Sequence, residues 1–594
     1  PERRAGRVLR GVAAVLALVW LGAPNWPEQI DDQLITLAFA HAWAETGQIR
    51  WGTGEVVEAC SSFLQLSLAT GWIALGGGDA NVFVKVLAAL AGVAMTLYAN
   101  ARLPLTVAGS LVLAALVGWE PTARWSFVGM ETSLYALLLT VGWAGVLGAA
   151  PGTVGGLGAL WLAATAHPEG NLHFALGALV ALRTPGREWR ERREWRAAVA
   201  FGAALALYHG LRVSAYGAFL PTPFLVKVAA NSPFGDQWGQ FGWETVTLVG
   251  IAAALVSGYR VRALALLPVC VQIAVELRAE PDWMGHARHL LPGVWATAVA
   301  WASTAEARPG GWRAMGVVAL VLGASLLQPP DHALPRPTLR TEGVLVSPLR
   351  WFTSALDTTQ REDVVIITEG TPMGGTVVAE DVGMPGNIPG VRVIDLVGLA
   401  TRDVALAALG DEEADDSLRR RFQGPPDRPV LVRRMVYAAD ELARPVPWVR
   451  LPSATRVIYP QGTALWYRLS SVRPSDEEVA ARWRAMHARY PSQGPVAWYH
   501  ALAEAELGRL VEAAAVADRM VRRFPGDALM GTLPSAVFAP FPIESYAEPP
   551  EGLRQVSRLI PRALAGRLAL VVGVEPNDDA GQVVHVSWSC GGAV

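Results

Sequence analysis

Apolar segments of spanning or nearly spanning length recur through the first 330 residues of the chain. The first covers about residues 11–23, and ten more follow at roughly 81–99, 104–119, 132–150, 153–166, 170–182, 197–215, 244–258, 262–278, 290–306 and 312–327. Because a bilayer core of about 30 Å requires about 20 apolar helical residues, the series predicts a polytopic α-helical membrane protein with about eleven transmembrane helices. An apolar content of 52% with only 17% charged residues excludes an ordinary soluble enzyme.

Arginines gather in three of the intervening loops and predict the orientation. The densest cluster runs from Arg183 to Arg196, and smaller ones lie at residues 260–262 and 308–313. Cytoplasmic loops carry the excess of basic residues, so these loops and the N-terminus are assigned to the cytoplasm. Consistent alternation then requires residues 61–76 to lie along the outer interface, or to re-enter, instead of spanning.

Beyond the transmembrane domain, residues 1–329, two further domains are predicted. Residues 330–472 carry two strand-like runs, Val364–Ile367 and Val391–Leu396, with a helical stretch after Asp403, which indicates an α/β domain outside the membrane. Residues 473–594 begin with a tetratricopeptide-like helix pair and end in two strand-like runs, 568–574 and 583–588. The helix pair is either a plain packed hairpin or a docking site for a protein partner.

Two adjacent carboxylates, Asp31 and Asp32, follow the first apolar segment directly. A carboxylate beside a bilayer is costly unless it faces water, a partner or a substrate, so the pair indicates a functional site. One of the two has a local alternative, because Asp is a favoured N-cap residue and Asp31 suits that role. Glu55 and Glu58 follow in the next polar stretch, where they either line a pocket or are solvated loop carboxylates.

Further acids, histidines and cations fall on the same outer face when the spans alternate. They lie at Glu131, at His167 and Glu169, in the stretch 221–227 and in the stretch 285–289. Glu131 and Glu169 at helix N-termini either satisfy the helix dipole or contact a substrate. His209, inside an apolar segment, is predicted to be a hydrogen-bonded core histidine.

Such a collection suits sugar transfer from a lipid-linked donor. The donor phosphate lies at the interface and needs cations beside it, for which the candidates are Lys227, Arg288, His286 and His289. Asp31 or Asp32 is the candidate general base for the acceptor hydroxyl. One base in line with a phosphate leaving group implies inversion at the anomeric carbon.

Seven motifs, in order, resemble those of one family. They are Asp31-Asp32-Gln33-Leu34-Ile35, Gly54-Glu55-Val56-Val57-Glu58, Gly129-Met130-Glu131-Thr132, His167-Pro168-Glu169-Gly170, Tyr216-Gly217 through Leu220-Pro221 to Lys227, Arg288-His289-Leu290-Leu291-Pro292 and Asp395-Leu396-Val397-Gly398-Leu399. Over roughly residues 8–405 the chain resembles the GT-C superfamily of polytopic glycosyltransferases. It is most similar to the bacterial branch that contains the mycobacterial terminal arabinofuranosyltransferase.

The resemblance implies a GT-C transmembrane fold in a bacterial inner membrane, with a periplasmic C-terminal part and a polyprenyl-phosphate sugar as donor. The residues it implies for sugar or acceptor binding are Glu55, Glu58, Glu131, His167, Glu169 and Tyr216. Three departures, Ala38, Ala59–Ser61 and His167, surround the implied sugar pocket, so the sugar is arabinofuranose-like or mannose-like. The acceptor is an envelope glycan or a protein.

No cofactor is expected. Paired carboxylates suit Mg²⁺ or Mn²⁺, but a monophosphate donor does not favour a metal, and the three isolated cysteines offer no CxxC spacing. A formal net charge of −2 does not favour nucleic acid as a partner, whereas membrane lipids are expected ones. Two other classes remain open, a transporter or flippase for a lipid-linked saccharide and a membrane-anchored scaffold that docks partners through its helical tail.

Overall fold

We analysed a computed structural model of the chain. The structure describes residues 2–26, 28–51, 56–148, 152–182, 193–217, 221–223, 264–276, 288–305, 367–368, 371–379, 383–395, 400–404, 429–436, 448–451, 463–469, 474–491, 494–523, 568–577 and 581–590. The chain divides into two compact units. Unit 1 comprises residues 1–357, 378–387 and 392–428, and unit 2 comprises residues 358–377, 388–391 and 429–594.

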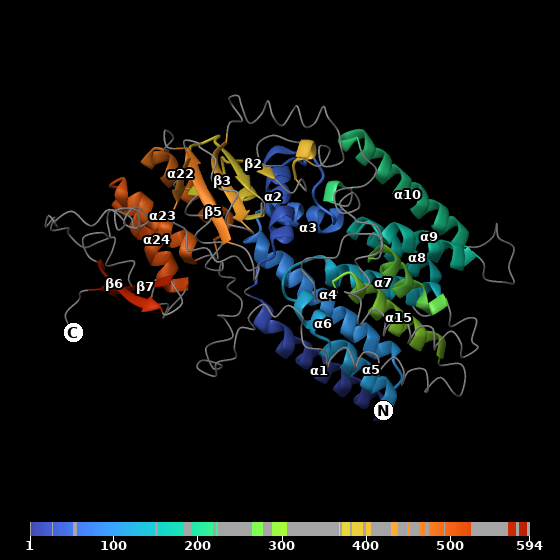
Figure 1. Ribbon diagram of the computed structural model, residues 1–594. Coiled ribbons are helices and arrows are strands. Elements are labelled where there is room, and N and C mark those ends of the chain that lie inside the picture. The colour runs from blue at the N-terminus through green and yellow to red at the C-terminus, as the bar shows by residue number, and fades with distance from the viewer. Residues whose placement is uncertain are drawn as a thin grey trace. The chain divides into compact units, whose positions relative to one another are not determined.

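Unit 1 is built from helices that pack side by side (Figure 1). They are α1 (Glu2–Gly22), η1 (Ala23–Asn25), α2 (Asp31–Thr46), α3 (Phe63–Ala74), α4 (Ala80–Arg102), α5 (Val107–Gly118), α6 (Glu120–Trp125), α7 (Thr132–Val146), α8 (Thr153–Ala166), α9 (Gly170–Leu182), α10 (Arg193–Tyr216), η4 (Leu264–Leu266), α14 (Leu267–Glu276), α15 (Leu290–Ala305) and α19 (Gly383–Gly386). The prediction of a mostly helical protein is confirmed.

Three of the described helices are long and apolar enough to cross a membrane. They cover Arg4–Asn25, Ala80–Arg102 and Arg193–Tyr216. Seven more apolar helices are shorter, and a helix of 12 residues such as α3 is only about 18 Å long. Two expected spans, 244–258 and 312–327, lie outside the described residues, so the total of eleven spans stays a prediction.

Residues 61–76, expected to lie along the interface or to re-enter, form the short helix α3. Its N-cap is Ser62, whose side chain accepts a hydrogen bond from the backbone N–H of Gln65. Gln65, Leu66 and Ala69 are buried, while Leu75 just beyond the helix is largely exposed. The length of α3 agrees with a helix that does not span, and its position in a bilayer stays a prediction.

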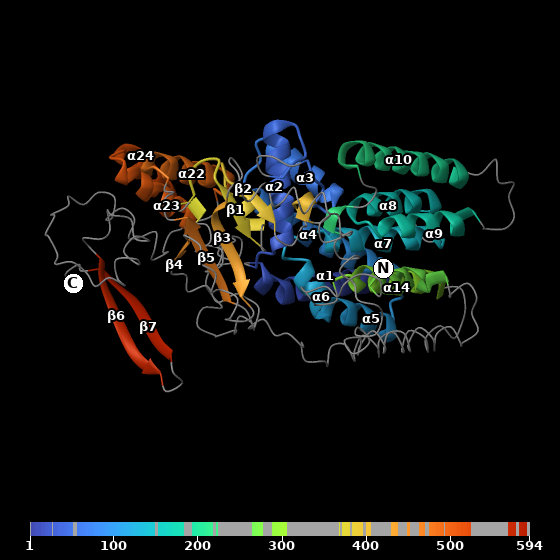
Figure 2. The ribbon, with the colours of Figure 1, turned by 45° about the horizontal axis from the view of Figure 1, so that its top comes forward.

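Side chains of widely different size pack the helical core. Trp125, Trp143 and Trp295 are fully buried in it. Elsewhere the helices touch through glycines, since a Cβ on Gly145 of α7 would lie 2.8 Å from the Cα of Gly156 in α8. Close packing through small residues is typical of membrane helices. In two views α8, α9 and α10 lie side by side (Figure 2).

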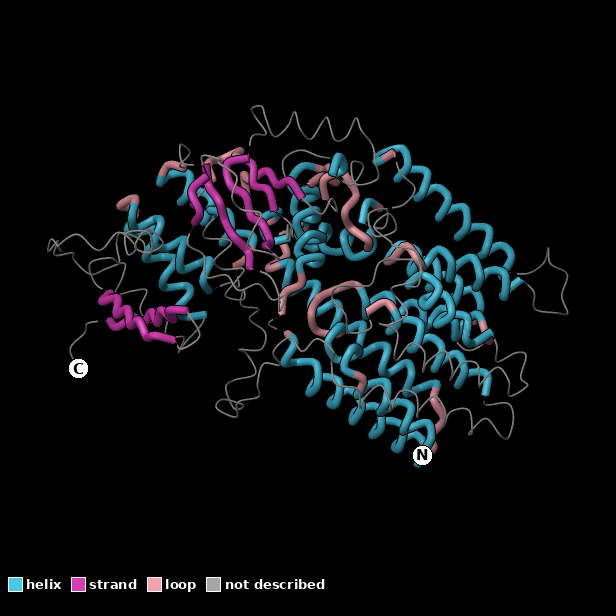
Figure 3. Tube along the Cα trace, viewed as in Figure 1, coloured by secondary structure: helices cyan, strands magenta, loops and turns pink. Residues whose placement is uncertain are grey.

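The strands of the described residues lie in the C-terminal half of the sequence (Figure 3). β1 (Thr376–Ala379) is adjacent to β2 (Arg392–Asp395), which confirms the strand expected at 391–396. In unit 2, β5 (Thr463–Leu469) pairs antiparallel with β3 (Pro429–Val436) and with β4 (Trp448–Leu451). The strand expected at Val364–Ile367 is wrong at Ile367, which is helical, and its other residues lie outside the described part.

Unit 2 also contains three consecutive helices and a terminal hairpin. The helices are α22 (Asp476–Arg489), α23 (Gly494–Glu506) and α24 (Leu510–Arg523), and α22 opens with a capping box between Ser475 and Glu478. Ala501 of α23 packs on Ala513 and Ala517 of α24, as the helix-pair pattern predicts. β6 (Leu568–Asn577) and β7 (Gly581–Cys590) form the expected antiparallel pair. The domain boundaries at 329/330 and 472/473 stay predictions.

Candidate functional site

Four helices of unit 1 begin at one place, and their first residues carry charged side chains. We call this set the helix-start network. Asp32 lies in the first turn of α2, Glu131 at the N-cap position of α7, Glu169 directly before α9, Arg288 and His289 directly before α15, and His167 at the C-cap of α8. These residues lie far apart in the sequence, so only the tertiary fold brings them together.

Arg288 joins two acids of the network. Its Nη1 lies 3.3 Å from Oδ2 of Asp32 and its Nη2 lies 2.9 Å from Oε1 of Glu131. Both Arg288 and Glu131 are buried, whereas the Asp32 side chain is 23% exposed. A cation at a helix N-terminus meets the positive end of the dipole, so Arg288 depends on these two carboxylates. Of these three paired residues, Asp32 is therefore the most accessible to solvent.

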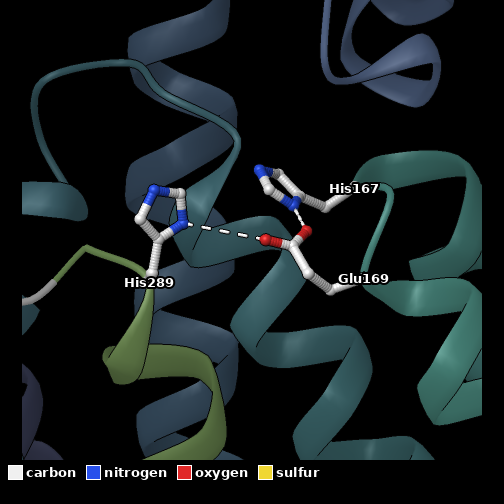
Figure 4. Close-up of side chains that lie close together, drawn as sticks. All are labelled: His167, Glu169 and His289. Carbon is white, nitrogen blue, oxygen red and sulfur yellow. Dashed lines mark ion pairs between the residues drawn. The ribbon is translucent and has the colours of Figure 1, made fainter. Parts of the chain in front are cut away.

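Three further side chains meet beside this pair (Figure 4). Oε2 of Glu169 forms an ion pair with Nδ1 of His167, and its Oε1 lies 3.9 Å from Nδ1 of His289. In the close-up the Glu169 carboxylate lies between the two imidazoles. Nε2 of His167 lies 3.9 Å from Oε1 of Glu131, which connects the two halves of the network.

Neither Glu131 nor the acidic pair caps its helix through a side chain. Glu131 occupies the N-cap position of α7, yet its side chain makes no capping hydrogen bond and turns to Arg288 instead. The N-cap of α2 is Ile30, so the interpretation of Asp31 as an N-cap is wrong. Oδ1 of Asp31 accepts a hydrogen bond of 2.7 Å from the backbone N–H of Gly383 in α19.

Gly383 approaches Asp31 so closely that only glycine fits there. A Cβ at this position would lie 2.3 Å from the backbone oxygen of Asp31 and 2.5 Å from its Oδ1. Asn387, one turn further on, donates to the backbone oxygen of Leu34 at 2.7 Å. α19 therefore fixes the first turn of α2, and with it the orientation of the acidic pair.

A second buried ion pair joins Arg212 of α10 to Glu58, which lies in the segment before α3. Nε and Nη2 of Arg212 bind both carboxylate oxygens of Glu58 at 2.5–3.0 Å. Burial raises the pKa of Glu58, although the hydrogen bonds from Arg212 act in the opposite direction. His209, one turn earlier, lies 2.8 Å from Oδ1 of Asn171 and 3.2 Å from Nη1 of Arg212, which confirms it as a hydrogen-bonded core histidine.

Hydrogen bonds to backbone oxygens connect the end of α10 and the residues after it to two distant segments. The backbone oxygen of Glu58 accepts from the N–H of Thr222 at 3.0 Å, and that of Tyr216 accepts from Nη1 of Arg402 at 3.1 Å. Cys60, two residues after Glu58, is buried, and burial raises the pKa of its thiol. The thiol therefore stays protonated and is a poor nucleophile.

The structure brings together six of the residues expected in the site and leaves three outside its description. Asp32, Glu131, His167, Glu169, Arg288 and His289 form the network. Asp31, Glu58 and Tyr216 are described with the partners given above. Glu55, Lys227 and His286 lie outside the described residues. Asp395, the first residue of the motif 395–399, is buried. Its Oδ2 accepts a hydrogen bond of 2.8 Å from the backbone N–H of Ala400, which connects the first residue of that motif to the residue directly after it.

Two buried cations were not expected from the sequence. Arg212 was overlooked inside an apolar segment, as was Lys85 of α4, whose Nζ donates to the backbone oxygens of Trp26 and Glu28 at 2.6 Å. The signal that identifies both is the same, because a cation within an apolar span requires a buried partner. The tie between Asp31 and Gly383 has no comparable local signal.

The arrangement offers several chemical capacities. Asp31 and Asp32 can accept a proton from a hydroxyl, while Arg288 and His289 can donate hydrogen bonds to an anion at a helix N-terminus. His167, Glu169 and His289 can supply ligand atoms to a metal ion, since those atoms all lie within 4.8 Å of one another. No protein-family model matches the chain, and no curated protein has significant sequence similarity to it.

Proposed function

We propose that the protein is a membrane glycosyltransferase of the GT-C type, which moves a sugar from a polyprenyl-phosphate donor to an acceptor hydroxyl. One observation carries the proposal. Six residues from four of the motifs that resemble that family form one network of ion pairs, although Asp32 and Arg288 are 256 residues apart. Motifs that served only helix packing would have no reason to place their charged members together.

The acidic pair supplies the base. An acceptor oxygen attacks the anomeric carbon while Asp31 or Asp32 takes its proton, and the bond from that carbon to the phosphate oxygen breaks with its electron pair left on the phosphate. Attack opposite the leaving group inverts the anomeric configuration. Asp32 accepts a hydrogen bond from Arg288 and Asp31 accepts one from Gly383, so both carboxylates have a defined orientation.

The cations at the start of α15 supply the leaving-group site. Arg288 and His289 present N–H groups at a helix N-terminus, where the dipole favours an anion. Negative charge grows on the phosphate as the glycosidic bond breaks, and donors fixed beforehand stabilise it. Lys227 and His286 are proposed as further phosphate partners, and Glu55, Glu58, Glu131, His167, Glu169 and Tyr216 as the sugar and acceptor side.

The remaining assignments belong to the same proposal. The enzyme crosses a bacterial inner membrane about eleven times, with a cytoplasmic N-terminus and its network on the periplasmic face. The sugar is arabinofuranose-like or mannose-like, and the acceptor is an envelope glycan or a protein. The helix pair α23–α24 is the proposed site for a protein partner.

The test is an activity panel with matched variants. Detergent-purified protein is incubated with radiolabelled polyprenyl-phosphate sugars and envelope glycan acceptors, beside the Asp31→Asn/Asp32→Asn double variant and a Glu477→Gln control in unit 2. We expect transfer from one donor by the wild type and the control, and none by the double variant. Circular dichroism and gel filtration establish that each protein is folded.

Two results would overturn the proposal. Movement of the saccharide across proteoliposomes without any product would indicate a transporter. Folded protein that binds the lipids, forms no product and captures a protein partner that survives both Asp→Asn changes would indicate a scaffold.

A further inference from the structure

His167, Glu169 and His289 have the composition and the spacing of a metal-ligand set. They come from the α8–α9 connection and from the start of α15, and one ligand atom of each lies within 4.8 Å of the others. In the close-up the Glu169 carboxylate lies between the imidazoles of His167 and His289, so the ends of the three side chains gather in one place (Figure 4). Two imidazoles and one carboxylate make up the three-ligand set found at catalytic zinc sites, which keep a fourth position open.

The charge of the surrounding residues favours a cation. The described part of the network contains three carboxylates, those of Asp32, Glu131 and Glu169, and one guanidinium, that of Arg288, which pairs with Asp32 and Glu131. With both histidines neutral, these groups carry a formal charge of −2, which a divalent cation would balance. The Glu169 side chain is only 4% exposed, and burial of uncompensated negative charge is costly.

A second layer of contacts orients the ligands. Nε2 of His167, the nitrogen that is not paired with Glu169, lies 3.9 Å from Oε1 of Glu131. Glu131 is in turn held by Arg288 at 2.9 Å and by Oγ of Ser61 at 3.5 Å. A carboxylate behind a ligating histidine is a common feature of metal sites, because it fixes the ring and strengthens the nitrogen as a donor.

We propose that His167, Glu169 and His289 bind one divalent transition-metal ion. Two imidazole nitrogens favour Zn²⁺, Mn²⁺ or Fe²⁺ over Mg²⁺, which prefers oxygen ligands alone. The site departs from the expectation of a metal-free protein, and it does not use the acidic pair. The inference is independent of sugar transfer, since metal binding is measured without any substrate.

The experiment is a titration of the purified full-length protein with Co²⁺ alone, after removal of metals by chelation. Co²⁺ in a tetrahedral or five-coordinate nitrogen and oxygen site gives visible d–d absorption, and we expect one equivalent to bind with that spectrum. In the His167→Ala/His289→Ala variant the absorption should be lost, and Glu169→Gln, which keeps the side-chain shape, should weaken binding strongly. His487→Ala in unit 2 is the matched control and should bind as the wild type does.

One variant tests the second layer. Glu131→Gln removes the charge behind His167 but none of the three ligands, so affinity for Co²⁺ should fall by about tenfold while the absorption spectrum persists. Folded wild-type protein that gives no d–d absorption overturns the proposal. Equal binding by the wild type and by folded His167→Ala/His289→Ala or Glu169→Gln protein does so as well.

Discussion

Two buried ionic clusters in this molecule are built in opposite ways. The helix-start network of unit 1 takes its charges from the ends of four helices and places Arg288 and His289 where the helix dipole disfavours a cation. In unit 2, the carboxylate of Glu504 in α23 accepts hydrogen bonds from Arg484 and Arg509. One turn earlier in α23, Nδ1 of His500 lies 2.9 Å from Nδ1 of His487 in α22.

The difference indicates what each cluster does. In unit 2 the charges lie on helix faces or just before a helix, within about 30 residues of one another, and fasten adjacent helices. In unit 1 they occupy helix starts that could have been capped by neutral residues, and they bring two imidazoles and a partly exposed carboxylate together. We infer that the unit 2 cluster stabilises its fold and that the helix-start network of unit 1 has a chemical role.

The largest expected effect is on the acidic pair. If Asp31 or Asp32 is the base, the corresponding Asp→Asn variant should lose transfer by about 100-fold to 10,000-fold, because an amide cannot take the acceptor proton. Initial rates with the donor identified by the panel measure this effect. Full activity in both folded single variants would contradict the assignment. It would also contradict the inferred chemical role of the helix-start network.

A structural effect of the next size is expected at Arg482 in unit 2. Its buried guanidinium donates to the backbone oxygens of Thr368, Thr371 and Pro389 at 2.5–3.1 Å, and burial lowers its pKa to about 10. Arg482→Met leaves buried carbonyls unpaired, so unit 2 should lose about 3 kcal/mol in its free energy of unfolding. Hydrogen exchange of α22 in the full-length protein measures this loss, and unchanged protection would show that the arginine is dispensable.

The stability of unit 2 should also fall in mild acid. Burial lowers the pKa of His500 below its ordinary value of 6.5, although Glu504 opposes that shift, and the facing groups His487, Arg484 and Arg519 carry no negative charge. Above pH 6.5 the imidazole is neutral in both states; below it the unfolded chain takes up a proton that the folded chain does not, so stability decreases.

Amide exchange in α23 of the full-length protein, corrected for intrinsic rates, should therefore speed up between pH about 7.5 and about 5.5. His500→Gln should reduce that dependence. The same acceleration in the variant would assign the acid sensitivity to another group.

The smallest effect is expected at Glu477. Its ion pair with Arg509 is solvent-exposed on both sides, and such pairs contribute little to stability. Glu477→Gln removes this pair but keeps the contact of Arg509 with the buried Glu504, so it should leave the melting temperature of the full-length protein unchanged within error. A clear decrease would show that the unit 2 cluster depends on its outer members as well as on its buried ones.

Much of unit 1 could be predicted from the sequence, because apolar periodicity is a local property. The segments at 153–166 and 170–182 coincide with α8 and α9, and the acid and base motifs fall at helix starts as alternation of the spans implies. The bridging role of Arg288 could not be predicted, because no local pattern connects it to Asp32 or Glu131. The tie between Gly383 and Asp31 is equally non-local, since it depends on a backbone approach 352 residues away.

The most direct test compares two matched buried acids. Glu131 and Glu504 are 2% and 1% exposed and each is paired with arginine, so Glu131→Gln and Glu504→Gln remove the same charge from equally buried positions in the two clusters. The measurement is the initial rate of sugar transfer per folded molecule for both variants and the wild type. We predict that Glu131→Gln loses most of the transfer rate while Glu504→Gln retains it. A wild-type rate in Glu131→Gln, or an equal loss in both variants, would contradict the claim that the helix-start network is the active site.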